Sequence, residues 1–146
     1  MIIAYIGLGS NLDNPVQQIN RALLALQAIP DTIVHRSSSL YQTTPVGFLA
    51  QPDFINAVAE LHTTLSYRAL FSQLQAIEKN QGRVRDGRKN HPRTLDLDFL
   101  LYGDLEINEP DLIIPHPRMM QRDFVLKPLL EIAPEVKIHP FQHFFD

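Results

Sequence analysis

The chain has 146 residues, of which 45% are hydrophobic and 20% are charged, with a net charge of -3 and no cysteine. This length and apolar content fit one globular domain over residues 1–146, and no apolar run reaches the roughly 18 residues that a membrane span needs. We therefore expect a cytoplasmic protein without a membrane partner. Disulfides and thiolate metal sites are excluded, so a metal must be held by oxygen or imidazole, and oxygen ligands favour magnesium or manganese.

The first two elements predicted along the chain are a strand and a helix. Residues 2–8 form a largely apolar run, typical of a central strand that is buried on both faces. Asn14 as N-cap and Pro15 at the first helical position predict the start of a helix, whose apolar residues recur at helical spacing until Pro30. One face of this helix is expected to lie on a sheet.

Two more strands and a second helix follow. Residues 32–41 and 54–62 predict the strands, and the loop between them, residues 43–53, has a length usually reserved for function. Ser66 predicts the N-cap of a helix that ends near Gly82.

A fourth strand, predicted over residues 95–102, completes the order βαββαβ. This order is that of the ferredoxin-like unit, so we expect the α+β class, with helices packed on an antiparallel sheet. Six prolines interrupt the chain from Glu109 onward, which predicts only short elements in an irregular C-terminal extension.

Asp96 and Asp98 in the fourth strand carry the clearest chemical signal. Alternate residues of a strand face the same way, which places the two carboxylates about 6.6 Å apart along the backbone. Aspartate is disfavoured in strands, and paired carboxylates repel each other without a counter-ion. An exposed alternating strand is the other explanation, but Leu100 and Tyr102 are expected to continue this face with apolar bulk. The pair therefore predicts a site for a hard cation such as Mg²⁺.

A basic segment precedes the aspartates and has only one acidic residue, Asp86. Its positive residues are Arg83, Arg85, Arg88, Lys89 and Arg93. On charge alone a solvated loop explains the segment equally well. Guanidinium groups bind phosphate oxygens bidentately, and magnesium bridges carboxylates to phosphates, so the neighbouring aspartates favour a nucleoside triphosphate site. We expect no nucleic acid partner, because the chain is acidic overall and no aromatic residue interleaves the cluster.

Four residues on predicted elements are further candidates. Glu78 opposes the helix dipole in the last turn of the second helix, with Gln75 near it, although an ordinary exposed glutamate has the same pattern. Phe54 and Asn56 share a strand face and suit a planar heterocycle, although such a pair is more often a core phenylalanine beside a satisfied asparagine.

His116 lies between two prolines and is followed by Arg118 and Arg122. This cluster predicts an anion contact, against the alternative of a surface loop histidine.

Together these residues resemble the 6-hydroxymethyl-7,8-dihydropterin pyrophosphokinase family of folate biosynthesis. The resemblance spans essentially the whole chain and is carried by Gly9-Ser10-Asn11, residues 51–56 (QPDFIN), Glu78, residues 82–85 (GRVR), residues 92–98 (PRTLDLD), residues 115–117 (PHP), Arg122 and Phe124. The fold that it implies is the same ferredoxin-like arrangement. The activity that it implies is transfer of the terminal diphosphate of ATP to the pterin hydroxymethyl group, with release of AMP.

The resemblance and the residue patterns together give an expected site. The residues are Asp96 and Asp98 for two Mg²⁺ ions; Gln75, Glu78, Arg83, Arg85, Arg93, His116 and Arg122 for ATP; and Thr43, Thr44, Pro45, Val46, Phe54, Asn56 and Phe124 for the pterin. Arg83 and Arg93 join the two aspartates as catalytic residues. No general base is assigned, and we expect a monomer with small-molecule substrates only.

Two other functions fit parts of the pattern. A different two-metal transferase, such as a polymerase-like palm, also places paired aspartates on a strand, and release of pyrophosphate would favour it. A ligand-binding regulatory domain of similar topology would need neither metal nor triphosphate. Both leave the full set of matching segments unexplained.

Overall fold

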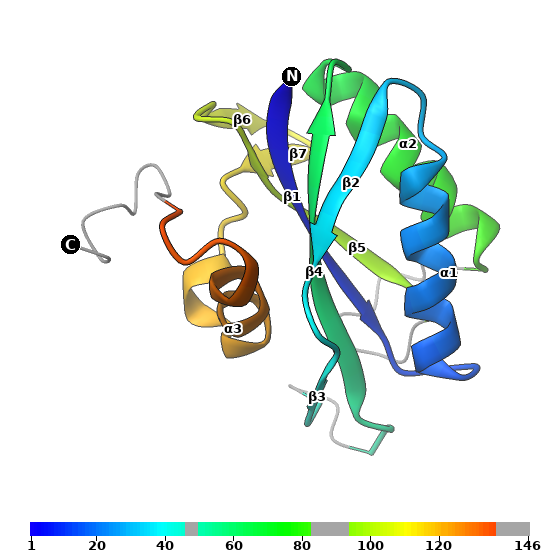
Figure 1. Ribbon diagram of the computed structural model, residues 1–146. Coiled ribbons are helices and arrows are strands. Elements are labelled where there is room, and N and C mark those ends of the chain that lie inside the picture. Colours follow the sequence, from blue (N-terminus) through cyan, green and yellow to red (C-terminus); the bar gives the residue numbers. More distant parts are fainter. Residues whose placement is uncertain (46–49, 83–93, 137–146) are drawn as a thin grey trace.

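In this computed structural model, the described residues are 1–45, 50–82 and 94–136. They form an α+β fold in which helices α1 (Pro15–Gln27) and α2 (Tyr67–Asn80) cover one face of an antiparallel sheet, and α3 (Asp123–Ile132) covers the other (Figure 1). The predicted fold class, α+β with helices on an antiparallel sheet, is confirmed. Among these residues, none of the helices has the length and hydropathy to span a membrane.

The main sheet contains the strands β1 (Ile2–Ser10), β2 (Thr32–Ser37), β3 (Tyr41–Thr43), β4 (Phe54–Thr63) and β5 (Asp96–Tyr102). Four of them lie in the order β2-β4-β1-β5, and the short β3 pairs with β4. The first strand is therefore central, as predicted, but it runs on through Gly9 to Ser10. The strand predicted over residues 32–41 is instead two strands, β2 and β3.

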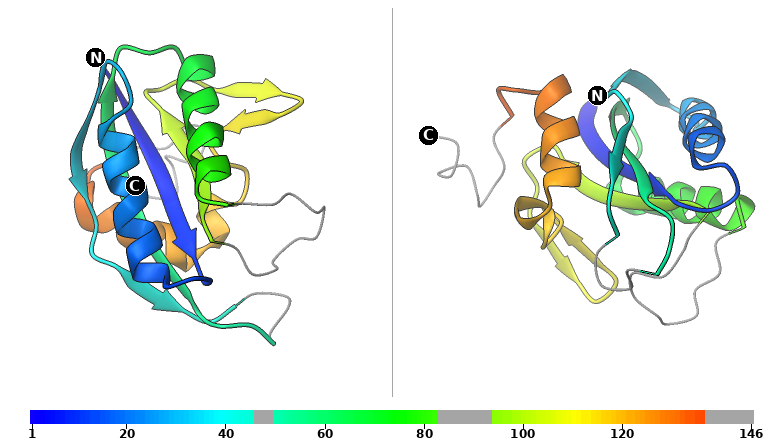
Figure 2. Two further views of the ribbon diagram at one scale, coloured as in Figure 1. Left: turned by 90° about the vertical axis from the view of Figure 1, so that its right-hand side faces the viewer. Right: turned by 90° about the horizontal axis from the view of Figure 1, so that it is seen from below.

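Each face of the sheet has its own apolar cluster. Side chains of β1, β4 and β5, including Ile6 and Leu61, are buried against α1 and α2. Figure 2 (left) shows both helices in front of the sheet. On the opposite face, Tyr5, Val58 and Leu101 lie in a second cluster with residues of α3. The strands are thus buried on both faces, which explains the nearly continuous apolar sequence of β1.

The helix starts agree with the sequence prediction at one of two places. The hydroxyl of Ser66 accepts a hydrogen bond from the backbone N–H of Ala69, as an N-cap does, and Gly82 follows α2 with φ of 85°. Asn14 precedes α1 but has φ of 66° and makes no side-chain cap hydrogen bond. That predicted cap is wrong, because the N-cap geometry requires an extended backbone.

The part of the chain after β5 is more regular than predicted. It contains the hairpin β6 (Ile107–Glu109) and β7 (Leu112–Ile114), a 3₁₀ turn (Met119–Gln121) and the ten-residue helix α3. Pro128 lies inside α3, where the lost backbone hydrogen bond costs about 3 kcal/mol. Burial of each large apolar side chain of α3 stabilises the fold by about 1.5–3 kcal/mol, which offsets this cost. The free energy gained by packing α3 therefore exceeds the cost of Pro128. The prediction of an irregular C-terminal extension is wrong, because this part of the chain contains a hairpin and a helix.

A register shift in β5 changes which residues share a face. Tyr5 of β1 pairs with Leu101, whereas Ile6 pairs with Phe99, so Leu100 is the extra residue. Leu100 continues the face of the aspartates, but Tyr102 is turned to the α1 and α2 face, where its hydroxyl donates to the carbonyl of Leu65. The expectation that Tyr102 continues the aspartate face is wrong, because a bulge breaks the alternation.

Leu129→Ala tests whether α3 is an integral part of the fold. Leu129 is fully buried, so its truncation is expected to lower the free energy of unfolding by about 2–5 kcal/mol. Urea denaturation followed by circular dichroism measures the change. Leu24→Ala on α1 is the matched control, since Leu24 is 75% exposed and should change stability by about 0.5 kcal/mol or less. Equal effects of the two substitutions would show that α3 is only loosely attached.

Candidate active site

Two glycines of β1 form the floor of the site. Gly9 pairs with Asn56 of β4 on one side and with Asp96 of β5 on the other, and Gly7 pairs with Asp98. All of these residues face α3, because directly paired residues of antiparallel strands point to the same side. Because Gly7 and Gly9 have no side chains, they leave a trough between the asparagine and the aspartates.

The trough opens into a cavity of about 280 Å³. Its described lining comprises Gly7, Leu8, Gly9, Thr43, Thr44, Phe54, Asn56, Ala57, Asp96, Asp98, His116, Pro117, Arg118, Arg122, Phe124 and Val125. The structure thus brings two rings, one amide and two carboxylates into one space. This combination suits a planar, polar heterocycle that carries a group to be modified at the aspartate end.

The amide of Asn56 lies between Thr43 and Gly9. Its Nδ2 donates a hydrogen bond of 2.7 Å to the hydroxyl of Thr43, and a Cβ atom at Gly9 would lie 3.1 Å from its Oδ1. Asn56 is buried, and the ring of Phe54 lies close to the same glycine. A buried amide whose NH₂ group already donates to one fixed acceptor offers a directed set of hydrogen bonds to a ligand.

His116 and Arg122 approach the carboxylate of Asp98 from the far wall of the cavity. His116 Nε2 lies 3.8 Å from Asp98 Oδ1, and Arg122 Nη1 lies 3.8 Å from Asp98 Oδ2. The guanidinium of Arg122 also lies 5.4 Å from the ring centroid of Phe124, at cation–π distance. These side chains come from the segment before α3 and from its first turn, so α3 positions one wall of the site.

The imidazole of His116 is neutral at physiological pH. Burial, followed by the positive charges of Arg122 and Arg118, lowers the pKa of His116 to about 4, and the charge of Asp96 only partly opposes this. Its Nδ1 accepts a hydrogen bond from the backbone N–H of Arg118. The remaining proton is therefore on Nε2, which makes His116 a hydrogen-bond donor toward the carboxylate side of the cavity.

A second cavity of about 340 Å³ adjoins the first. Asp96, Asp98, His116 and Pro117 line both cavities. The other described residues of the second cavity are Phe71, Glu78, Leu97, Phe99, Pro110, Asp111, Leu112 and Ile113. The pair of aspartates is therefore the boundary between two binding spaces.

Glu78 is a buried carboxylate that connects α2 to the strand of the aspartates. Its Oε2 accepts a hydrogen bond of 2.8 Å from the backbone N–H of Leu97, the residue between Asp96 and Asp98. The alternative of an ordinary exposed glutamate is therefore wrong. The position of Glu78 indicates that it orients the strand as well as lining the second cavity.

Other expected site residues are placed differently or not described. Gln75 is exposed on α2 and lines neither cavity, and Pro45 is buried but is not part of either lining. Val46, Arg83, Arg85 and Arg93 lie outside the described residues, as do Arg88 and Lys89.

Sequence reasoning missed two parts of the site. Gly7 and Gly9 are not among the predicted site residues, although glycines at alternate positions on one strand face indicate an open floor. The β6–β7 hairpin was not predicted, because prolines interrupt this part of the sequence. Residues Pro110 to Ile113 nevertheless form a wall of the second cavity. Apart from Asp111, which is paired with Arg68, the side chains of this wall are apolar and carry no chemical signal.

Two adjoining cavities that share a pair of carboxylates on an α+β scaffold are the arrangement expected of a two-substrate transferase. A family model described as 7,8-dihydro-6-hydroxymethylpterin-pyrophosphokinase (HPPK) matches residues 5–134. The chain is 49% identical over 136 residues to the 2-amino-4-hydroxy-6-hydroxymethyldihydropteridine pyrophosphokinase of Haemophilus influenzae, covering 93% of this chain and 84% of that protein. The Pseudomonas aeruginosa protein of the same name is 47% identical over 139 residues, covering 95% and 85%.

The chain belongs to the 7,8-dihydro-6-hydroxymethylpterin-pyrophosphokinase family. It is an enzyme, a pyrophosphokinase of folate biosynthesis that moves diphosphate from ATP to the hydroxymethyl group of the dihydropterin. A crystal structure of an HPPK-DHPS in complex with substrates superposes with a TM-score of 0.70 at 16% identity. The match covers 94% of this chain and 41% of that longer chain. Because the sequence identity is low, this likeness shows the fold alone. The resemblance inferred from the sequence is confirmed.

Gly9→Ala tests the floor of the first cavity. The added methyl group would lie 3.1 Å from Asn56 Oδ1 and force the amide to move, whereas at Gly7 the nearest atom would be 3.6 Å away, an ordinary contact. Overpacking costs about 1–3 kcal/mol, so KM for the pterin should rise about tenfold or more in Gly9→Ala. Gly7→Ala, the control, should raise it much less. Steady-state kinetics at saturating ATP measure both, and equal KM values would contradict this account of the floor.

Proposed function

We propose that diphosphate transfer takes place at the boundary of the two cavities, with the pterin in the first and ATP in the second. The observation that carries this proposal is the sharing of Asp96 and Asp98 by both linings. A transfer reaction requires its two substrates to meet in line at one point, and a shared wall of carboxylates is suited to that point. Phe54, Phe124 and Asn56, with Thr43 and Thr44, then contact the pterin.

Asp96 and Asp98 are proposed to hold magnesium, as two ions. Their donor set fits this metal, because both carboxylates face the same way on β5 and hard oxygen ligands are those that Mg²⁺ prefers. When bound, magnesium neutralises the charge of the triphosphate oxygens. Nη1 of Arg122 lies 3.8 Å from Oδ2 of Asp98, so its positive charge lies beside the proposed metal ligands.

The reaction needs alignment more than covalent catalysis. The pterin hydroxyl oxygen forms a bond to the β-phosphorus, the bond from that phosphorus to the oxygen of AMP breaks, and the hydroxyl proton is released. Stacking between Phe54 and Phe124 orients the ring, and the Asn56 amide fixes its edge. Nε2 of His116 and the guanidinium of Arg122 donate to phosphate oxygens. Arg83, Arg85 and Arg93 remain proposed triphosphate ligands on the strength of the sequence.

We also infer that the core is a ferredoxin-like unit within a single domain of 146 residues that works as a monomer. The order β2-β4-β1-β5 with two helices on one face supports the first point, if β3 is regarded as an added strand. One sheet contains β1 to β5, which supports a single domain. Residues of one chain line both cavities, which supports a monomer with small-molecule substrates.

The nucleotide product tests the proposed reaction. ATP and 6-hydroxymethyl-7,8-dihydropterin should give AMP and the pterin diphosphate in equal amounts, because the bond broken lies between the α- and β-phosphates. Anion-exchange chromatography with ³¹P NMR identifies both products. ADP as the product would indicate transfer of a single phosphate, and free pyrophosphate would indicate nucleotidyl transfer. Either result would contradict the proposal.

Asp96→Asn and Asp98→Asn test the metal ligands. Each should lower kcat by about a hundredfold or more, beyond the usual effect of outer-sphere residues, while the thermal unfolding curve shows a folded protein. Asp104→Asn is the matched control, because Asp104 is exposed beyond the end of β5 and lines neither cavity. Full activity of either active-site variant at millimolar magnesium would remove that carboxylate from the metal site.

A further inference from the structure

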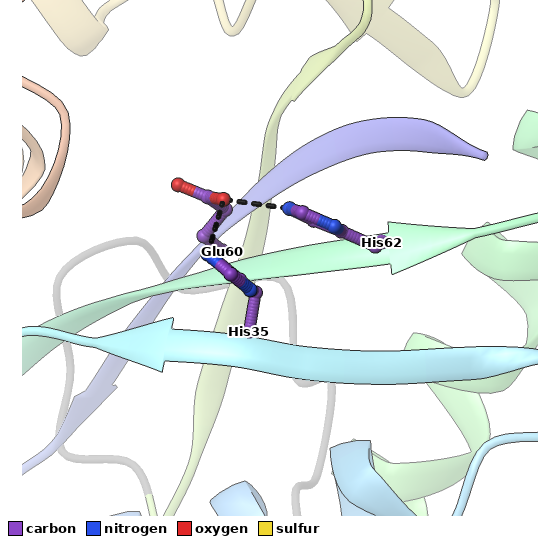
Figure 3. Close-up of side chains that lie close together, drawn as sticks. All are labelled: His35, Glu60 and His62. Carbon is purple, nitrogen blue, oxygen red and sulfur yellow. Dashed lines mark hydrogen bonds and ion pairs between the residues drawn. The ribbon is translucent and has the colours of Figure 1, made fainter.

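A second group of possible metal ligands lies on the same face of the sheet, away from the active site. It consists of His35 on β2 with Glu60 and His62 on β4 (Figure 3). Asn56 and Glu60 are four residues apart on β4, about 13 Å along the strand. The group is therefore separate from the carboxylates of the active site.

A bulge in β2 brings the first histidine to the group. Val34 pairs with Leu61, and Arg36, two residues later, pairs with Glu60, so His35 is the extra residue. In such a bulge both residues opposite one partner are turned toward the same side. His35 and Arg36 consequently both face Glu60, which regular alternation would not allow.

The carboxylate of Glu60 is held with one oxygen toward the histidines. Its Oε1 accepts hydrogen bonds from the hydroxyl of Tyr5 at 3.1 Å and from Nε of Arg36 at 3.0 Å. Its Oε2 lies 2.7 Å from Nε2 of His62 and 4.0 Å from Nε2 of His35. The three ligand atoms lie within 4.8 Å of one another, which is compact enough for a single ion to replace the proton between them.

Glu60 is ionised despite being only 2% exposed. Burial by itself raises the pKa of this carboxyl, but hydrogen bonds from His62 and Tyr5 and the charges of Arg36 and His35 bring it below its ordinary value. A metal-binding carboxylate must be deprotonated, and one that is oriented by neighbours binds more tightly. Tyr5 and Arg36 supply that orientation, although the charge of Arg36 reduces the attraction for a cation.

We propose that His35, Glu60 and His62 bind one divalent transition metal ion of the zinc class. Two imidazoles and one carboxylate are a ligand set of zinc sites that leave a fourth position to water. The two histidine rings are stacked at present, with centroids 4.3 Å apart and planes 17° apart. An ion lies in the plane of each imidazole that it binds, so one ring must turn. His35 is free to do so, since half of its side chain, 51%, is exposed.

Binding at this site cross-links β2 to β4 and should stabilise the sheet. An ion that binds the folded protein and not the unfolded chain raises the midpoint of thermal unfolding. Without metal, a network of hydrogen bonds from Tyr5, Arg36 and His62 compensates the buried charge of Glu60. The proposal does not depend on the assignment of the active site, because its measurements do not use enzymatic activity.

The test uses the full chain carrying Asp96→Asn and Asp98→Asn, which removes the proposed catalytic ligands. Titration with Co²⁺ is expected to give one equivalent of binding, with visible absorption typical of a coordinated ion, and Zn²⁺ should displace it. In this background, His62→Gln and His35→Gln should each weaken binding about tenfold or more. His35→Gln is the more secure variant for folding, because its side chain is exposed. His116→Gln, the same substitution elsewhere, should leave this binding unchanged.

Thermal unfolding with and without Zn²⁺ gives an independent measurement. At the same Zn²⁺ concentration, the rise in midpoint should be smaller in His35→Gln and His62→Gln than in the background protein. Saturable binding that neither substitution weakens would overturn the proposal. Failure to bind either ion at all would likewise show that the network serves only to compensate Glu60.

Discussion

The register of β1 between β4 and β5 is the constraint on which the site depends. It places Gly9 between Asn56 and Asp96, and Gly7 beside Asp98, all on the face toward α3. A shift of one residue would turn every one of these side chains to the opposite face. The apolar side chains of β1 that face α1 and α2 oppose such a shift, because it would remove them from the cluster under those helices. The apolar cluster under α1 and α2 thus determines which side chains of the sheet face the cavity on the α3 side.

Glu78 extends this constraint to the edge of the sheet. Because β5 is the last strand in the order β2-β4-β1-β5, one edge of its backbone has no strand partner among the described residues. The buried carboxylate of Glu78 accepts the N–H of Leu97, between the two aspartates. This contact satisfies a backbone donor and ties the edge strand to α2. A buried carboxylate is costly, so its use at this position favours orientation of Asp96 and Asp98 over stability alone.

Sequence patterns predicted the parts of the fold that local chemistry determines. The cap at Ser66, the helix end at Gly82 and the shared face of Asp96 and Asp98 depend on residues that are neighbours in the chain. The bulge that redirects Tyr102 depends on the pairing of β5 with β1, and α3 forms in spite of Pro128 because the sheet buries its apolar side chains. These partners are distant in the sequence, so a local sequence pattern does not indicate them. The walls built from the β6–β7 hairpin were unpredictable for the same reason.

The α3 face of β4 shows how one strand serves two polar sites. Asn56, Val58, Glu60 and His62 alternate along this face, and only Val58 belongs to the apolar cluster under α3. The helix covers the middle of the strand and leaves polar side chains near both ends, beside Gly9 at one and beside Tyr5 at the other. Buried polar groups require partners, which Thr43 supplies to Asn56, and Tyr5, Arg36 and His62 supply to Glu60. Asn56 lines the first cavity, and one oxygen of Glu60 lies toward two histidines. The two polar ends of this face of β4 are therefore the places at which we propose that the pterin ring and the metal ion bind.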